Sequence, residues 1–503
     1  MVTAAGEDYE ESEASGQVID LGAAEPTPDA PHVITWDPVA GAPEYYIYGD
    51  PYFNNTYGFL GTATGQETFR DIGFLPDFTI TPPIARPLFA TVNNFPKVSA
   101  SYQQRRFFGG SKASPDRIDG SRIGFPVNFG ISSPLQDDDA LTFRLAANQH
   151  QPIRHLAGVK RLVVLTDAGE WSVKGDERGV LTPSALNADQ ETYAGCADIR
   201  PVVIGNSIIY VQARGSILRD LRFDIEVEGL AGRDLTIFSS HLFDGRTMRR
   251  IDYAQTPHSI VWAVRDDGKL LGMTYIRELD VWGWHRHDSF QSDGTTGFFW
   301  DVCVVPEAVG DSVYFIVRRT IDGNTVRYIE KLEKREIDAA NFDAEVFFVD
   351  AGLSYSGAPV NNVAGLGHLE GQVVAVVGDG AVIFNGDPAG AGAANFTING
   401  AGTFPVDFPA SYSNIHVGLR IIADLETLDL DVEGGNVRDK MKGVSPVQLL
   451  IDRSSRTFSA GPSSANLRPY APPTWEPGAD EFTGQVEIST TKVLNKYGRV
   501  FVR

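Results

Sequence analysis

Short apolar runs that pair across tight turns recur at nearly even spacing along most of this chain, and this pattern limits its fold more than any other feature. The run Leu162–Leu165, for example, turns through Asp167–Gly169 into Trp171–Val173. The turns lie near residues 168, 215, 268, 323 and 380, so the gaps between them are 47, 53, 55 and 57 residues. Asp-Gly pairs at several of these turns suit tight hairpins, because type I′ turns need positive φ at both central residues. Each unit therefore predicts a β-hairpin.

The spacing of the hairpins predicts the fold class. A period near 50 residues in a β-rich chain is typical of a β-propeller, in which each repeat forms a four-stranded blade. Helix is scarce in the sequence, and Tyr328–Phe342 is the one clear candidate for a helix. We therefore predict an all-β fold, with a β-propeller-like main domain over residues 95–460. A set of stacked β-sandwiches is the alternative that the pattern leaves open.

Three segments outside this main domain have a different composition. Residues 1–30 hold eight acidic residues and no Lys or Arg, which predicts an acidic disordered arm. Residues 31–94 are predicted to form a small fibronectin-III-like β unit that opens with a hairpin of His32–Trp36 and Tyr45–Tyr48. Residues 461–503 begin rich in proline and are predicted to be an extended C-terminal segment, ending in a β-hairpin over Val486–Val502.

Charge and cysteine content exclude several classes of protein. A net charge of −22 and a pI near 4.8 argue against ordinary nucleic-acid binding, which needs basic surface. The two cysteines, Cys196 and Cys303, are too few for a disulfide framework and fit a reducing cytoplasm. No signal-peptide pattern opens the sequence, and no apolar run approaches the ~18 residues of a membrane helix. We expect no membrane insertion.

The stretch from Phe95 to Leu141 separates the small β unit from the long series of hairpins. Val98–Phe108 is predicted to be one strand with Arg105 and Arg106 at its centre, ended by two glycines. Asp137, Asp138 and Asp139 follow near the end of the stretch. We expect the arginines to fork onto the aspartates, because a guanidinium matches a carboxylate bidentately. The alternative is that these charges face solvent or pair locally.

Three constellations could carry chemistry. His285 and His287 share one face of a strand near Glu278, but two ligands at strand spacing are weak evidence for zinc, and a stacked aromatic–histidine strand is expected. Paired carboxylates of the kind used by glycosidases are numerous, but most sit at turns, where aspartate is favoured for its backbone hydrogen bonds. No phosphate-binding loop or nucleophile elbow is present in the sequence. We expect no catalytic activity, no cofactor and no bound metal.

A family resemblance emerges from the order of several weak motifs. Gln103, Gln104, Arg105, Arg106 and Phe107 lie within YQQRRFFGG, which is followed by Ser-Arg-Ile-Gly, by Asn-Phe and by Asp-Asp-Asp-Ala over residues 137–140. Together these motifs resemble the tail tubular protein B, tail nozzle or stabilisation proteins of tailed bacteriophages. The resemblance spans roughly residues 30–460. Its further motifs lie at Trp171, 235–242, 282–287 (with Trp284 and His285), 366–371 and 417–430.

The resemblance implies a structural role in the virion. The chain would be a subunit of a tail tube or nozzle ring, built as a propeller, assembled in the host cytoplasm and located in the phage tail. Its partners would be further copies of itself in a sixfold ring, the head-to-tail adaptor, tail fibre or tip proteins, and passing double-stranded DNA that is not specifically bound. The ring would extend the DNA channel and help to retain and release the genome.

The sequence also leaves two other functions open, and its acidic residues suggest which surface would line a channel. A carbohydrate-binding or glycosidase-like tail propeller is one alternative, and a scaffold for attaching tail fibres is the other. If the ring conducts DNA, an acidic wall would keep the duplex mobile, because basic walls bind phosphate. The residues expected to line such a channel are Asp424, Glu426, Asp429, Asp431 and Glu433, together with the acidic arm.

Overall fold

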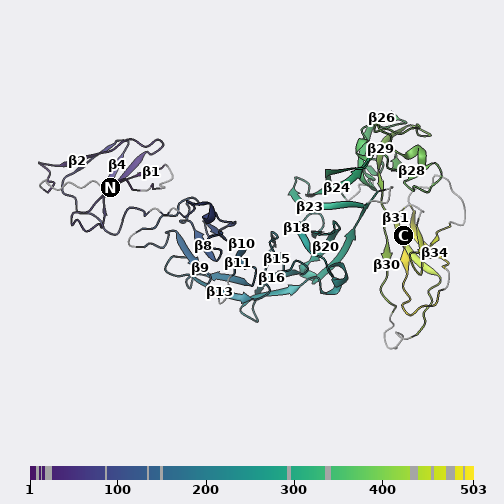
Figure 1. The fold of residues 1–503 in the computed structure, drawn as a ribbon, viewed down its shortest axis with the longest axis horizontal. Coiled ribbons are helices and arrows are strands. Elements are labelled where there is room, and N and C mark those ends of the chain that lie inside the picture. The colour runs from purple at the N-terminus through teal and green to yellow at the C-terminus, as the bar shows by residue number, and fades with distance from the viewer. Residues whose placement is uncertain are drawn as a thin grey trace. The chain divides into compact units, whose positions relative to one another are not determined.

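The computed structural model describes the chain outside residues 7–10, 13, 17–24, 85, 87, 133–134, 148–150, 292–295, 335–340, 431–439, 455–457, 472–481 and 491–492. The described part is almost entirely β-structure arranged in many small sheets (Figure 1). This confirms the predicted all-β class. The chain forms two compact units, one of Met1–Asp267 with Leu271–His285, the other of Gly268–Leu270 with Arg286–Arg503.

The N-terminal region holds two small sheets. One sheet has the order β1-β3-β4 and the other pairs β2 with β5. Their bounds are β1 Val2–Ala5, β2 His32–Thr35, β3 Glu44–Gly49, β4 Gly58–Thr64 and β5 Thr68–Asp71. The hairpin expected between the strands now seen as β2 and β3 is wrong, because they lie in different sheets.

The prediction of a disordered arm over residues 1–30 is wrong at its start. β1 pairs with β3 from Val2 opposite Ile47 to Ala5 opposite Glu44. Thr3 and Tyr48 both donate hydrogen bonds to the Glu11 carboxylate, so this acidic residue is held against the sheet. Most of the other acids of the arm lie outside the described residues.

Five four-stranded antiparallel sheets then follow one another in sequence, each with its strands in chain order. The first comprises β6 Val98–Tyr102, β7 Arg105–Gly109, β8 Arg117–Gly120 and β9 Leu141–Arg144. The second comprises β10 Ile153–Gly158, β11 Leu162–Thr166, β12 Glu170–Lys174 and β13 Asn187–Thr192. The third comprises β14 Val202–Ile204, β15 Ser207–Val211, β16 Leu218–Asp224 and β17 Gly229–Asp234.

The fourth and fifth sheets repeat this arrangement. The fourth comprises β18 Met248–Ala254, β19 Ile260–Arg265, β20 Leu270–Ile276 and β21 Val281–His287. The fifth comprises β22 Ser289–Phe290, β23 Thr296–Pro306, β24 Asp311–Ile321 and β25 Asn324–Lys331. The predicted helix over Tyr328–Phe342 is wrong at its start, which lies in β25, and the short helix α1 occupies only Phe342–Glu345.

The predicted hairpins are confirmed in these sheets. β11 and β12, β15 and β16, β19 and β20, and β24 and β25 are neighbours joined by the expected turns. Asp322 and Gly323 have φ of 46° and 73°, the values that a type I′ turn requires. The inner strands β11 and β15 are buried along their whole length, which is why they read as unbroken apolar runs.

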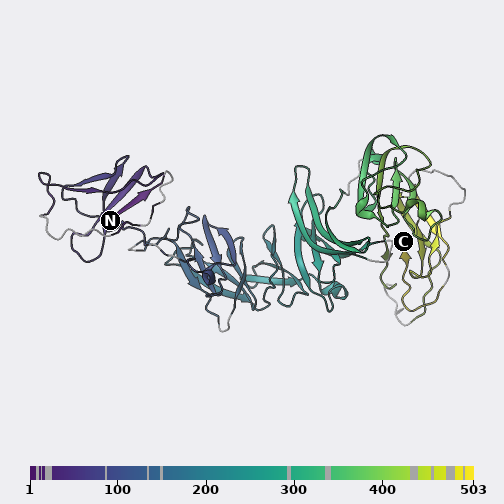
Figure 2. The same cartoon turned by 45° about the horizontal axis from the view of Figure 1, so that its top comes forward.

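The chain beyond the fifth sheet is organised differently. A four-stranded sheet has the order β26-β29-β27-β28, with bounds β26 Val349–Val360, β27 Ala375–Gly378, β28 Ala381–Asn385 and β29 Tyr412–Arg420. The last strands form a sheet of order β30-β35-β32-β33 and a pair of β31 with β34. Figure 2 shows the strands of this region in yellow-green to yellow near the C-terminus. Their bounds are β30 Leu425–Glu426, β31 Val447–Ser454, β32 Ser459–Gly461, β33 Arg468–Pro469, β34 Phe482–Ile488 and β35 Phe501–Val502.

The predicted C-terminal hairpin does not form. β34 pairs with β31, and β35 pairs with both β30 and β32, so residues 461–503 interleave with residues 425–460 and do not form a separate segment. Val447, Val486 and Ile488 are buried in a shared apolar cluster, which favours this long-range pairing over a local turn. In the described part of the chain, no helix is long and apolar enough to cross a membrane.

Candidate functional site

The motif YQQRRFFGG forms a tight hairpin and not the single strand expected from its sequence. β6 ends at Tyr102, and Gln103 and Gln104 turn the chain with φ of 47° and 57°. The side chain of Gln103 donates to the carbonyl of Gly179 (2.7 Å) and accepts from the backbone N–H of Leu181 (2.9 Å). This glutamine therefore ties the first sheet to the loop between β12 and β13 in the second.

Arg105 is the centre of the site. Its side chain is 1% exposed, because alternation along β7 turns Arg105 and Phe107 into the core. Its Nη1 donates to the carbonyl oxygens of Ser121 (2.7 Å), Asp138 (3.3 Å) and Asp139 (2.6 Å), and its Nη2 donates to that of Asp137 (2.8 Å). Arg105 therefore fixes the backbone of the acidic loop, defined here as Asp137–Asp139.

The carboxylates of the acidic loop have other partners, so the predicted Arg–Asp fork is wrong in its chemistry. Asp138 pairs with Arg122 at 2.7 Å. Asp139 is fully buried and accepts from the backbone N–H and hydroxyl of Ser132 and from the N–H of Gln136. Arg122 also lies 3.6 Å from the Asp139 carboxylate. The two carboxylates are therefore bound by local donors and by Arg122, and not by the arginines of the motif.

The two arginines of the motif differ in environment. Arg106 points to the opposite face from Arg105, is exposed, and stacks over the Phe108 ring at 5.3 Å. Burial lowers the pKa of Arg105, and the nearby Asp138 and Asp139 carboxylates act in the opposite direction. Contacts to backbone carbonyls suit Arg105 to hold a loop in one conformation.

Trp284 and His285 lie on opposite faces of β21, each against a different partner. Trp284 donates from its ring nitrogen to the Leu235 carbonyl (2.8 Å) and packs edge-on against Phe243. His285 lies edge-on to Trp262 and covers Gly272 on the neighbouring strand. Both contacts are edge-on, so these rings pack against aromatic neighbours but do not form the stacked arrangement that was expected. In the described part of the chain, no group of three or more His, Cys, Asp or Glu side chains is placed to hold a metal ion.

Replacing Gly272 with alanine should destabilise the fourth sheet. A Cβ at this position would lie 2.2 Å from the His285 ring, so the ring must move out of its site. We expect a loss of about 1–3 kcal/mol in the free energy of unfolding. Denaturant titration measures the loss. Gly283→Ala in the adjacent strand is the matched control, because nothing lies within 4 Å of its added Cβ, and equal losses in both variants would contradict the prediction.

Glu170 is a buried carboxyl group that the sequence analysis did not single out. It lies at the start of β12, is fully buried, and accepts a hydrogen bond from Thr192, with the Tyr210 hydroxyl also close to it. Burial raises the pKa of Glu170 above its usual value near 4.5, although the Thr192 hydroxyl acts in the opposite direction. The folded protein therefore retains a proton here that the unfolded chain releases.

This raised pKa predicts a pH dependence of stability. The contribution of Glu170 is complete below pH 4.5 and is lost as the pH rises through the raised value. The free energy of unfolding should fall by up to about 1.4 kcal/mol per pH unit within that window, relative to Glu170→Gln. Denaturant titrations from pH 4 to 9 test this. If the free energy of unfolding varies with pH in the same way in the wild type and in Glu170→Gln, the prediction is contradicted. Glu177→Gln, at an exposed turn, serves as the control.

The acids expected to line a channel are largely paired. Asp424 forms a bidentate contact with Arg503 (2.7 and 2.9 Å), and Glu426 and Asp429 both contact Arg499 (3.2 and 2.5 Å). Pairing of β30 with β35 brings these groups together. Asp431 and Glu433 lie outside the described residues.

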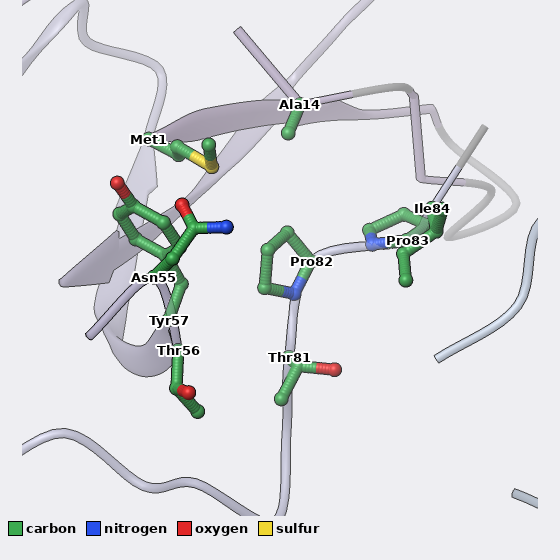
Figure 3. A pocket seen from close by; sticks show the side chains of 9 residues that line it. All are labelled: Met1, Ala14, Asn55, Thr56, Tyr57, Thr81, Pro82, Pro83 and Ile84. Atoms are coloured by element: carbon green, nitrogen blue, oxygen red, sulfur yellow. The ribbon is translucent and has the colours of Figure 1, made fainter. Parts of the chain in front are cut away.

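A cavity of about 270 Å³ lies in the N-terminal region (Figure 3). Figure 3 shows Asn55 and Tyr57 beside Met1, with Pro82 and Pro83 across the cavity. Its lining is completed by Ala14, Thr56, Thr81 and Ile84. All nine side chains are uncharged, and Met1 also carries the N-terminal ammonium group. No local pattern predicts this cavity, because its lining comes from four segments that are separate in the sequence.

Comparison with known proteins identifies no family. No family model and no curated protein matches the chain. Two solved structures are similar at a low level. A Lactobacillus plantarum protein has 9% identity and a TM-score of 0.29 over 64% of this chain and 90% of its own. A Bacteroides fragilis protein described as a candidate 6-phosphogluconolactonase has 11% identity and a TM-score of 0.26 over 62% and 87%.

The second comparison corrects one expectation. The sequence analysis predicted a chain without catalytic activity, and one of these two proteins carries an enzyme's name. The expectation of no activity is withdrawn. The enzyme name belongs to the Bacteroides fragilis protein, and no reaction is assigned to this chain from it.

Proposed function

We propose that this chain is a structural subunit of a bacteriophage tail, forming a tube or nozzle ring below the head-to-tail adaptor. The observation that carries the proposal is the role of the motif residues. Gln103, Arg105 and Phe107, which carry the resemblance to nozzle proteins, hold the hairpin, the acidic loop and the core at the start of the repeated sheets. These contacts are architectural, as a structural subunit requires.

We also propose that the five successive four-stranded sheets are blades of a propeller-like domain. Each has its four strands in chain order, as a propeller blade has. Apolar clusters join consecutive sheets, since Phe107 and Trp171 share one cluster and Val211 and Val261 share another. The small sheets before β6 are proposed to be a fibronectin-III-like unit attached to this domain.

The ring would act as a conduit for the genome. A net charge of −22 per copy disfavours tight binding of DNA phosphates, so a duplex could pass without being held. Because Arg499 and Arg503 offset part of the acidic run at 424–429, the proposed channel surface depends on the chain's other acids. Adaptor and tail fibre or tip proteins are the proposed neighbours in the virion.

Electron microscopy of the purified chain and of the particle that contains it tests the proposal. We expect rings with an axial channel, and we expect an antibody against the chain to label the tail below the head. A chain that stays monomeric at high concentration, together with an antibody that labels no part of the particle, would reject the proposal.

A further inference from the structure

The sheet β26-β29-β27-β28 has two edges, and each is formed by an uncharged strand segment. β26 pairs through one side with β29, and β28 pairs through one side with β27. The ten residues 351–360 of β26 and all five residues of β28 contain no Asp, Glu, Lys or Arg. An edge strand presents unpaired backbone groups that can pair with another chain.

Charges mark the last strand of every one of the five earlier sheets, in contrast to β28. Those charged residues are Arg144 in β9, Asp189 and Glu191 in β13, Arg233 and Asp234 in β17, Arg286 in β21, and Arg327, Glu330 and Lys331 in β25. Charged residues on edge strands oppose unwanted pairing. Charged residues are also absent from the first strands β6, β14 and β22 and from the edges β1 and β4 of the N-terminal sheet, but the uncharged run of ten residues in β26 is longer than any of these. No charge on β28 or on this run of β26 therefore opposes pairing with another strand.

The two edges also match in length and accessibility. Between its two register shifts, β26 pairs regularly with β29 over the four residues Leu353–Ser356, and β28 has five residues. Leu353 is 47% exposed and Val382 in β28 is 57% exposed. A buried apolar cluster anchors the inner strands and thereby holds both edge strands in place. The edges therefore lose little conformational entropy when another strand pairs with them.

We infer that β28 of one copy of this chain adds to β26 of the next copy, so that the sheet continues from subunit to subunit. A second copy is the occupant because both uncharged edges belong to one sheet and have similar lengths. A contact between two different edges is heterologous, and such contacts close into rings when the rotation allows. Two copies that each carry a net charge of −22 repel each other, and this repulsion is weakest where the surfaces that meet are uncharged. The inference rests on the proposed ring assembly and names its interface.

Charged substitutions on the two edges test the contact. Leu353→Lys and Val382→Glu, each alone, should weaken assembly at least about tenfold, measured by light scattering after size exclusion as the concentration of half-assembly. The double variant carries opposite charges on the two facing edges, so it should assemble better than either single variant. Ile329→Lys is the control. It lies 77% exposed on β25, a strand that is already charged, and should leave assembly unchanged.

Hydrogen exchange supplies a backbone readout. Amides of Leu353–Ser356 and of β28 should exchange slowly in assembled protein and quickly in the single variants. Rings that form equally well with both single variants would overturn this inference and leave the proposed function standing. Failure of the double variant to recover would overturn the pairing of unlike edges. A wild-type chain that never assembles would overturn both the inference and the ring.

Discussion

Arg105→Ala is expected to lower the local stability of the first sheet by about 3 kcal/mol or more. The substitution removes a fully buried guanidinium and leaves the carbonyl oxygens of Ser121, Asp137 and Asp139 without their donor. Each carbonyl that stays buried without a partner costs about 1–3 kcal/mol. Native-state hydrogen exchange over residues 105–141 measures the local free energy of opening directly.

The adjacent arginine supplies the control for this prediction. Arg106→Ala removes an equal charge that is exposed and stacked on Phe108, so we expect a loss below about 1 kcal/mol. Arg105→Lys should lose most of the stability that Arg105→Ala loses. A single ammonium group cannot reach all the carbonyl oxygens that the two guanidinium nitrogens contact. Equal protection factors in Arg105→Ala and Arg106→Ala would contradict the assigned role.

The sequence predicted the local elements of this fold well because their signals are local. Asp322-Gly323 takes positive φ at both residues, and the runs on each side alternate as paired strands do. The pattern also separates buried inner strands, such as Leu162–Thr166, from half-exposed outer ones. Turn chemistry and periodicity are therefore sufficient to find most hairpins of the five sheets.

Long-range pairing could not be predicted in this way. β1 joins β3 across some 40 residues, and β30 joins β35 across more than 70, with no turn between them to fix the register. No local sequence pattern in Val486–Val502 indicates that β34 pairs with β31 and not with the strand that follows it in the sequence. These choices depend on apolar clusters that exist only after the chain has folded.

The candidate site shows the same division. Two arginines followed by three aspartates suggested ion pairs, and the structure brings Arg105 to all three residues of the acidic loop. The contact is made to carbonyl oxygens, which every residue has and which no sequence pattern marks. The pairing of Asp138 with Arg122, a residue of the Ser-Arg-Ile-Gly motif, was not predicted, although Arg122 is closer to Asp138 in the sequence than Arg105 is.

A second buried arginine should be as important to the C-terminal unit as Arg105 is to the first. Arg319 in β24 has a side chain that is 0% exposed, and it binds Glu330 in β25 through two hydrogen bonds of 2.6 and 2.7 Å. It also donates to Ser289 (2.6 Å) and contacts Asp350 at the start of β26 (3.4 Å). Burial acts to lower the pKa of Arg319, but the two carboxylates outweigh it and raise the pKa above its usual value.

Arg319→Met is expected to cost about 3–5 kcal/mol of unfolding free energy. The methionine keeps most of the side-chain volume, but the Glu330 and Asp350 carboxylates lose the cation that both of them contact. Arg318→Met is the control, since Arg318 lies on the other face of β24 over Phe298 at 4.4 Å and should cost less than about 1 kcal/mol.

A triple variant identifies the origin of the loss. If stranded charge is the cause, adding Glu330→Gln and Asp350→Asn to Arg319→Met should recover a large part of the stability, although hydrogen bonds have been removed. If lost packing is the cause, the two further changes should lower stability again. Denaturant titration of the single and triple variants distinguishes the two, and a triple variant less stable than Arg319→Met would contradict the charge-based explanation.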